Sequence, residues 1–165
     1  MQDLGIIIGR FQPFHKWHKL LFDTAIAECK SVLVLIGSSN KTDTNNPYSY
    51  ELRKEIIEAE ISGDTVFIWD LPDFDTDGEW IRYILSYIPQ AVNSCTLYCG
   101  DESHDSAVAA IISSKESFHF DFIIKEIPRS IIPISATQVR KYIKNWENEK
   151  LEDFLLPSTI EKVLS

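Results

Sequence analysis

Short apolar runs that alternate with helical stretches constrain the fold of this chain more than any other feature. The runs are rich in β-branched or aromatic residues and span residues 4–8, 31–36, 65–69, 96–99 and 120–124. Continuous apolar runs of this length are typical of strands buried on both faces. Strands that alternate with helices imply parallel crossover units. We therefore expect an α/β fold with three layers and a mostly parallel five-stranded sheet.

The stretches between these runs carry helical patterns. The expected helices cover residues 18–29, 50–61, 80–88 and 106–114, and a last helical region covers about 135–165, with a break near Pro157. A chain of 165 residues has the length of one ordinary domain. We therefore expect a single domain over residues 1–165.

Charge and composition exclude several classes of function. The chain has 16 Lys and Arg against 25 Asp and Glu, a formal charge of -9. This balance argues against non-specific binding to nucleic acid or to anionic membranes, which depends on attraction to phosphate. The charge balance still allows binding of a small polyanionic ligand, provided that basic groups are concentrated at its site. The chain also has no signal-peptide pattern, no membrane-length apolar run and no zinc-like cysteine spacing, so we expect a cytoplasmic protein.

Three of the apolar runs end in glycine, namely Gly9, Gly37 and Gly100. Ligands of parallel sheets bind beyond the carboxyl ends of the strands, which is where these glycines lie. The simpler interpretation is that each glycine only permits a tight turn. Their shared position favours a binding site at this edge of the sheet.

The segment after the first strand is GRFQPFHKWH, residues 9–18. It joins a strand to a helix, where α/β folds hold phosphates against helix amides. His15 and His18 are three apart and share one face at a helix start. Two imidazoles there could donate hydrogen bonds to a phosphoryl group as its charge develops. The alternatives are a solvated helix start, or zinc binding without the usual i, i+4 spacing and glutamate.

A second segment, ISATQVR, spans residues 134–140. Ser135 and Thr137 have the residue types of a helix N-cap and first turn, and free amides there can hold an anion. Arg140 follows one turn later. The alternative is an ordinary cap beside a surface arginine.

Together these segments resemble the H-x-G-H and I-S-x-T-x-x-R signatures of the nucleotidyltransferase superfamily. The form Gly-Arg-Phe-Gln-Pro-Phe-His resembles the archaeal-type and bacterial bifunctional-type nicotinamide mononucleotide adenylyltransferases. Residues 36–39 and 46–53 resemble further stretches of this family. The resemblance implies a Rossmann-like nucleotidyltransferase fold, here without the Nudix domain of the bifunctional relatives.

The resemblance also implies a reaction. The 5′-phosphate of nicotinamide mononucleotide would attack the α-phosphorus of ATP, giving NAD and pyrophosphate. This nucleophile is already ionised, so neither a general base nor a covalent intermediate is needed. The implied partners are these two substrates and Mg²⁺ held mainly by the ATP phosphates, with no protein metal site. The sequence is also compatible with a homo-oligomer. Two alternatives are a related enzyme with another phosphate acceptor and a non-catalytic nucleotide sensor.

The resemblance assigns roles to thirteen residues. The catalytic residues are His15, His18 and Arg140; the ATP-binding residues are Gly9, Arg10, Phe11, Gly100, Asp101, Ser135 and Thr137; and the mononucleotide-binding residues are Ser38, Asp77 and Trp80. Trp80 follows an acidic stretch, 70–79, that suits the cationic pyridinium ring of nicotinamide. The alternatives are a core tryptophan and a solvated acidic loop.

The chain departs from the family at two positions beside the expected site. Trp17 stands where the family usually has a small residue, most often glycine. Its large side chain would either narrow the phosphate site or point outward as core. Asn45 stands where some archaeal members have a basic residue, so the acceptor phosphate would be held differently.

Overall fold

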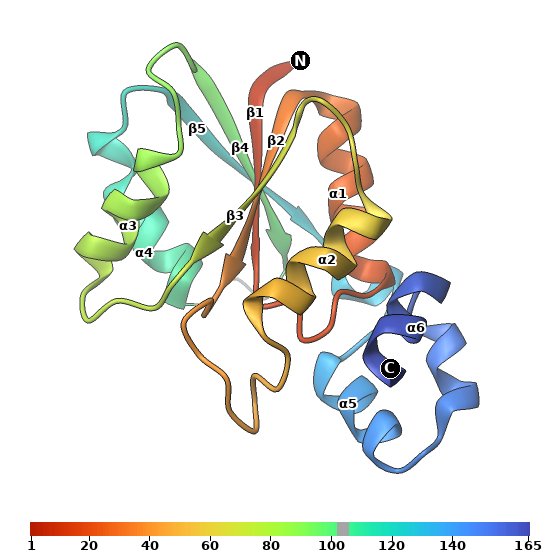
Figure 1. Cartoon of the computed structure of the whole chain (residues 1–165). Helices are drawn as coiled ribbons and strands as arrows, with labels where there is room; N and C mark the ends of the chain where they lie inside the picture. The colour runs from red at the N-terminus through yellow and green to blue at the C-terminus, as the bar shows by residue number, and fades with distance from the viewer. Residues whose placement is uncertain (102–105) are drawn as a thin grey trace.

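The computed structural model of the chain describes residues 1–101 and 106–165 (Figure 1). Its centre is one five-stranded sheet in the order β3-β2-β1-β4-β5, in which every pairing is parallel. The strands are β1 (Gln2–Gly9), β2 (Cys29–Gly37), β3 (Val66–Leu71), β4 (Ser94–Gly100) and β5 (Asp121–Ile127). The predicted α/β class is confirmed, and the sheet is wholly parallel.

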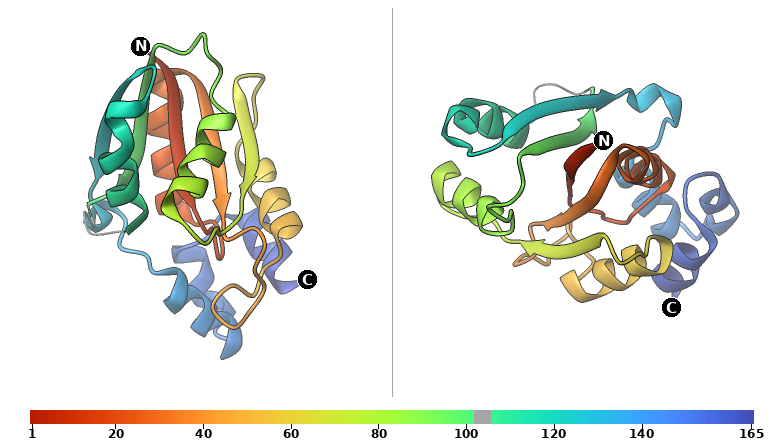
Figure 2. Two further views of the ribbon diagram at one scale, coloured as in Figure 1. Left: turned by 90° about the vertical axis from the view of Figure 1, so that its left-hand side faces the viewer. Right: turned by 90° about the horizontal axis from the view of Figure 1, so that it is seen from above.

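Helices cover both faces of the sheet (Figures 1 and 2). One face carries α1 (Lys16–Glu28) and α2 (Tyr50–Glu60), and the other carries α3 (Asp77–Ser86) and α4 (Ser106–Ser114). Strand β2 shows why its sequence is continuously apolar. Its residues Val32, Val34 and Ile36 pack in the core under α1 and α2, whereas Leu33 and Leu35 pack under α3 and α4.

The C-terminal region lies beyond the carboxyl ends of the strands (Figure 1). It contains α5 (Ala136–Lys144), a 3-10 turn (Asn148–Asp153) and α6 (Pro157–Leu164). The sequence predicted a break in a helix near Pro157. The structure instead begins α6 at Pro157, because proline suits the first helical turn. The hydroxyl of Thr159 donates to Glu60 of α2, which places α6 against the main body.

The order of the strands locates a crevice. The chain builds β1, β2 and β3 outward in one direction and then crosses to β4 on the other side of β1. Ligands of such sheets bind at this reversal, outside the carboxyl ends of the strands. Gly9 ends β1 and Gly100 ends β4, so both border the crevice. None of the helices within the described ranges has the length and apolar character to cross a membrane.

Candidate active site

A cavity of about 800 Å³ opens at the carboxyl ends of β1, β2 and β4. It brings together nearly all the residues that the sequence singled out. The predicted residues that line it are Gly9, Arg10, Phe11, His15, His18, Ser38, Asp77, Trp80, Gly100, Ser135, Thr137 and Arg140. Asp101 is outside this lining: its carboxylate accepts a hydrogen bond from the amide of Arg129 at 3.1 Å. A ribose contact by Asp101 therefore gains no support from the geometry.

His15 and His18 form a defined pair at the start of α1. Their rings stack with centroids 3.7 Å apart. The amide of His15, the N-cap residue, donates to Nδ1 of His18 at 3.2 Å. Because Nδ1 accepts, the proton of a neutral His18 is on Nε2. His18 is thus a hydrogen-bond donor with one fixed tautomer.

Aromatic side chains surround His18 and keep it neutral. The ring of Phe11 lies 4.8 Å away edge-on, and that of Phe14 stacks at 5.6 Å. Burial is the main cause that holds the pKa of His18 well below its usual range, and electrostatic interaction with the His15 ring and with Arg129 adds to this shift. Burial likewise lowers the pKa of His15 to about 3, and the positive charge of Arg129 adds to this shift. Nδ1 of His15 is buried without a hydrogen-bond partner. Both imidazoles are therefore neutral at pH 7.

Arg140 is held at the other wall of the cavity. Ser135 caps α5 by accepting from the amide of Gln138 at 3.4 Å, which confirms the predicted N-cap. Arg140 donates to the carbonyl of Gln12 at 2.8 Å and to the hydroxyl of Thr137 at 3.4 Å. Burial and the nearby charge of Arg10 lower the pKa of Arg140. Arg10 and Arg140 both line the cavity, and their positive charge favours an anionic ligand there.

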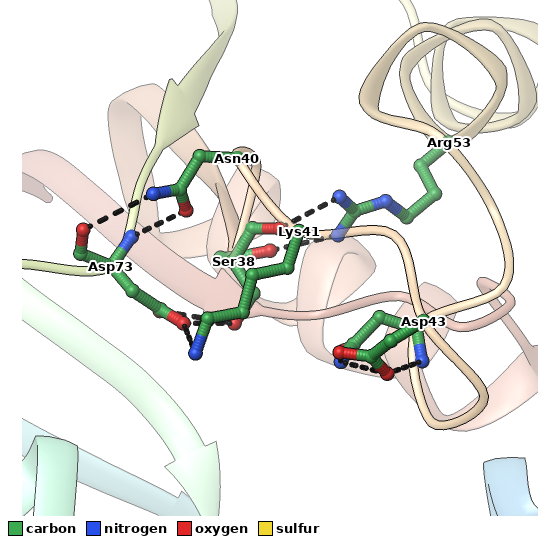
Figure 3. A network of polar contacts seen from close by, with 8 residues as sticks. Ser38, Asn40, Lys41, Asp43, Arg53 and Asp73 are labelled. Atoms are coloured by element: carbon green, nitrogen blue, oxygen red, sulfur yellow. Dashed lines mark hydrogen bonds and ion pairs between the residues drawn. The ribbon is translucent and has the colours of Figure 1, made fainter.

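Arg53 is the buried residue that organises this edge of the sheet. Its side chain is fully buried, and Figure 3 shows it reaching the turn after β2. Its guanidinium donates to the carbonyls of Arg10 and Gly37 at 2.7 Å each, and to Ser38 at 3.2 Å. Arg53 thereby fixes the ends of β1 and β2 relative to each other. The sequence placed Arg53 in a family stretch but gave no sign of this role.

Lys41 is a cavity residue that the sequence reasoning missed, and Asp73, also in the cavity, belongs to the acidic stretch 70–79 but had no role of its own. Lys41 pairs with the carboxylate of Asp73 at 2.7 Å, and the hydroxyl of Ser38 donates to the same carboxylate at 3.0 Å (Figure 3). The contacts join the loop after β2 to the loop after β3. The one signal in the sequence is that Lys41 is the only basic residue in the polar stretch 38–49.

The acidic stretch around Trp80 divides into two parts. Asp70 belongs to β3, and its carboxylate accepts from the hydroxyls of Tyr83 and Tyr87. Helix α3 begins at Asp77, earlier than the expected start at Trp80, because Thr76 caps it. Asp77 therefore lies in the first helical turn. Trp80 lines the cavity and also packs partly against the core under α3 and α4.

Trp17 belongs to the core under α1 and α2 and also lines the cavity, so both expectations for it hold in part. The indole is 2% exposed and lines the cavity wall near the end of β4. Its Nε1 donates to the carbonyl of Pro128 at 3.4 Å. The departure from the family pattern at Trp17 therefore changes the β4 side of the cavity. Within residues 1–101 and 106–165, no group of three or more His, Cys, Asp or Glu side chains is placed to hold a metal ion.

Comparison with known proteins decides the family. The cytidylyltransferase-like family matches residues 6–142, which include both signature segments, the second half of β1 and the other four strands. The chain belongs to the cytidylyltransferase-like family. This family assignment agrees with the one that the two signature segments predicted.

Named relatives and solved structures agree with this assignment. The cytidylyltransferase-like chain is 27% identical to the nicotinamide-nucleotide adenylyltransferase of Thermococcus kodakarensis, over 98% of this chain and 82% of that protein. Its match to the corresponding enzyme of Pyrococcus abyssi is 25% identical and covers 96% of this chain and 81% of that one. These similarities confirm the predicted resemblance to nicotinamide mononucleotide adenylyltransferases.

A structural comparison gives the same fold. The bifunctional NMN adenylyltransferase/ADP ribose pyrophosphatase of Francisella tularensis matches with a TM-score of 0.66 and 27% identity. The match covers 88% of this chain and 43% of that one, so the cytidylyltransferase-like chain spans less than half of the Francisella protein. That protein has also been solved with AMP and a manganese ion. The Rossmann-like nucleotidyltransferase fold is therefore confirmed.

Proposed function

We propose that the chain transfers the adenylyl group of ATP to nicotinamide mononucleotide, giving NAD and pyrophosphate. The observation that carries the proposal is that one cavity joins the two phosphate-binding segments to an aromatic, acidic end at Trp80. The names of the relatives, nicotinamide-nucleotide adenylyltransferases, support the same reaction. The cavity volume is in the range of sites for nucleotide-sized ligands.

The donor phosphates are assigned to the wall between α1 and α5. Nε2–H of His18 and the guanidinium groups of Arg10 and Arg140 offer hydrogen bonds and positive charge there. The first amides of α5, near Thr137, add the partial positive charge of a helix N-terminus. Keeping His18 as a neutral donor costs little free energy in the free enzyme. Its hydrogen bond to the substrate strengthens as negative charge grows on the α-phosphate.

The acceptor is assigned to the opposite end. Trp80 offers a ring face to the pyridinium, and the carboxylates of Asp73 and Asp77 favour its positive charge. Ser38 and Lys41 follow the end of β2 and also line the cavity. Lys41 is therefore placed to hold the acceptor phosphate, for which Asn45 has no charge to offer.

The chemistry is a single displacement. An oxygen of the mononucleotide phosphate forms a bond to the α-phosphorus, and the bond from this phosphorus to the pyrophosphate oxygen breaks. The protein has no proton to remove, so its work is positioning and charge stabilisation. Mg²⁺ bound to the ATP phosphates would neutralise charge on the leaving pyrophosphate. The phosphate oxygens are hard ligands that suit this ion. Among the described residues, no group of three or more His, Cys, Asp or Glu side chains is placed to hold it.

A second candidate is a nucleotide sensor that binds ATP without turnover. Trp17 favours it, because a buried indole occupies the wall beside the histidines where the family usually has a small residue. The neutral histidine pair and Arg140 favour the enzyme, since their donors face the cavity as the reaction requires.

The test is to incubate the chain with ATP, Mg²⁺ and one acceptor at a time. The acceptors are nicotinamide mononucleotide, nicotinate mononucleotide and phosphopantetheine, and products are separated by chromatography. We expect NAD from the first acceptor and no product from phosphopantetheine. ATP binding without any product would favour the sensor, and product from phosphopantetheine alone would favour another acceptor class.

A second experiment tests the single displacement with chiral α-thio ATP. A single in-line displacement inverts the configuration at the α-phosphorus, whereas a covalent intermediate retains it.

A further inference from the structure

Gln12 lies in the loop after β1, and its side chain is buried in the wall of the cavity. A buried side-chain amide needs hydrogen-bond partners, and Gln12 finds them on one residue of another loop. Its Nε2 donates to the carbonyl of Tyr48 at 3.1 Å, and its Oε1 accepts from the amide of Tyr48 at 3.0 Å. Two bonds to the backbone of one residue fix both the distance and the orientation of the loop that carries Tyr48.

The main chain of Gln12 serves the donor wall of the cavity. Its carbonyl accepts from Nη1 of Arg140 at 2.8 Å. The preceding residue, Phe11, has a left-handed backbone with a φ of 50°, which a bulky residue keeps only where its surroundings hold it. The two bonds from the Gln12 side chain belong to these surroundings. The side chain therefore helps to set the carbonyl that orients Arg140.

The side chain of Gln12 also serves the acceptor wall. Tyr48 lies near the end of the loop between β2 and α2, which carries Lys41. At the start of this loop, Asn40 makes the same kind of paired contact with the backbone of Asp73 (Figure 3). Its Nδ2 donates to the carbonyl at 3.3 Å, and its Oδ1 accepts from the amide at 2.9 Å. Lys41 therefore lies between two anchors, one on each side.

The stretch between Lys41 and Tyr48 is a closed turn. Asp43 and Asn46 exchange two backbone hydrogen bonds of 3.1 Å each. The carboxylate of Asp43 also accepts from the amides of Asn45 and Asn46 at 2.8 and 3.0 Å. A turn held in this way transmits a displacement of Tyr48 to Lys41 instead of absorbing it.

We propose that Gln12 is a positioning residue that couples the two walls, through Arg140 on the donor side and through Lys41 on the acceptor side. The proposal rests on the proposed function for the identity of the two phosphates. Gln12 acts through these two cations, because its amide group and its carbonyl are bonded to protein partners. The two cations must hold two phosphates at reacting distance, and small errors in such placement cost binding and rate.

The experiment uses the full chain with Gln12→Met, which keeps the length of the side chain and removes both of its hydrogen bonds. Gln12→Met is measured alone, with Arg140→Ala and with Lys41→Ala, beside the two alanine variants alone. The matched control is Gln90→Met, because Gln90 is exposed. Calorimetry gives the Kd for ATP and the Kd for nicotinamide mononucleotide, and thermal scans without ligand give Tm.

We expect Gln12→Met to raise both Kd values by roughly 3- to 10-fold, the value of the lost hydrogen bonds. Its effect on the Kd for ATP should shrink to less than about twofold when Arg140 is already alanine, whereas effects at independent positions would multiply. Its effect on the Kd for nicotinamide mononucleotide should shrink in the same way in Lys41→Ala. Gln90→Met should match the wild type.

Wild-type Kd values for both substrates in Gln12→Met would overturn the proposal, and a lower Tm beside them would show a structural role alone. Effects that multiply in either double variant would also overturn it, because Gln12 would then not act through that cation. If Gln12→Met does not fold, the same comparisons with Gln12→Glu decide, since an ionised glutamate accepts from the amide of Tyr48 but cannot donate to its carbonyl. A wild type that binds both substrates but makes no NAD would refute the proposed function, while the comparison of Kd values would still decide the role of Gln12.

Discussion

At the scale of single residues, His18 can act on a phosphate only as a neutral hydrogen-bond donor. Its Nδ1 is occupied by the amide of His15, and burial keeps the ring uncharged. His18→Ala should therefore lower kcat by roughly 10²-fold or more, with a smaller change in the Kd for ATP. Stopped-time NAD assays measure kcat, and exposed His119→Ala is the matched control. Near-normal turnover in both His15→Ala and His18→Ala would refute the catalytic role.

Arg140 belongs to the donor end of the cavity. Its guanidinium is already oriented by Gln12 and Thr137, so the contact to phosphate should require the planar fork. Arg140→Ala should raise KM for ATP by about tenfold or more, and Arg140→Lys should not restore it. Lys141→Ala, on the exposed face of the same helix, should leave KM unchanged. A wild-type KM for ATP in Arg140→Ala would remove Arg140 from the donor site.

Trp80 distinguishes this reaction from those of related enzymes with other acceptors. Its ring face suits a flat cation and offers little to an extended chain. Trp80→Ala should raise KM for nicotinamide mononucleotide by roughly three- to thirtyfold, the value of a cation–π contact, and leave KM for ATP near normal. Trp80→Phe should recover part of the loss. The exposed Trp146→Ala serves as control. Equal damage to both KM values, or loss of folded protein, would assign Trp80 to the core.

At the scale of elements, local patterns predicted the strands and helices well. Strand β2 was recognisable because Val32 and Leu33 alternate between two cores, which makes the whole run apolar. The signature segments placed His18 and Arg140 in one site because each lies at a strand or helix end. Local sequence patterns did not predict the contacts between distant segments. Lys41 meets Asp73, and Arg129 meets Trp17, only after the sheet has formed, so their partners could not be identified from spacing.

The start of α1 should also make stability depend on pH. The pKa of His15 is about 3 in the folded chain and about 6.5 when unfolded. Between these values the unfolded chain binds more protons, so the free energy of unfolding should fall as pH drops below about 6.5. His15 alone contributes at most about 1.4 kcal/mol per pH unit, and His18 acts in the same direction.

Urea unfolding between pH 7.5 and 5 measures this dependence. The slope should be smaller in His15→Gln than in the wild type, because the titrating imidazole is gone. His119→Ala, which removes an exposed histidine, should keep the wild-type slope. Equal slopes in all three proteins would show that His15 titrates normally in the folded state.

At the scale of the whole molecule, the cavity exists only because remote parts of the chain meet. The bond from Arg140 to the carbonyl of Gln12 ties α5 to the loop after β1. The amide of Lys16, at the start of α1, donates to the carbonyl of Phe154 at 3.0 Å. The region after residue 135, including the stretch that contains Phe154, is therefore part of the framework of the site.

The central claim is that both substrates react within this one cavity, and the product, NAD, should span it. A crystal structure of the chain with NAD tests this most directly. We expect the nicotinamide ring against Trp80 and the pyrophosphate within hydrogen-bond distance of His18 and Arg140. NAD bound elsewhere, or bound with its pyrophosphate away from both residues, would contradict the claim.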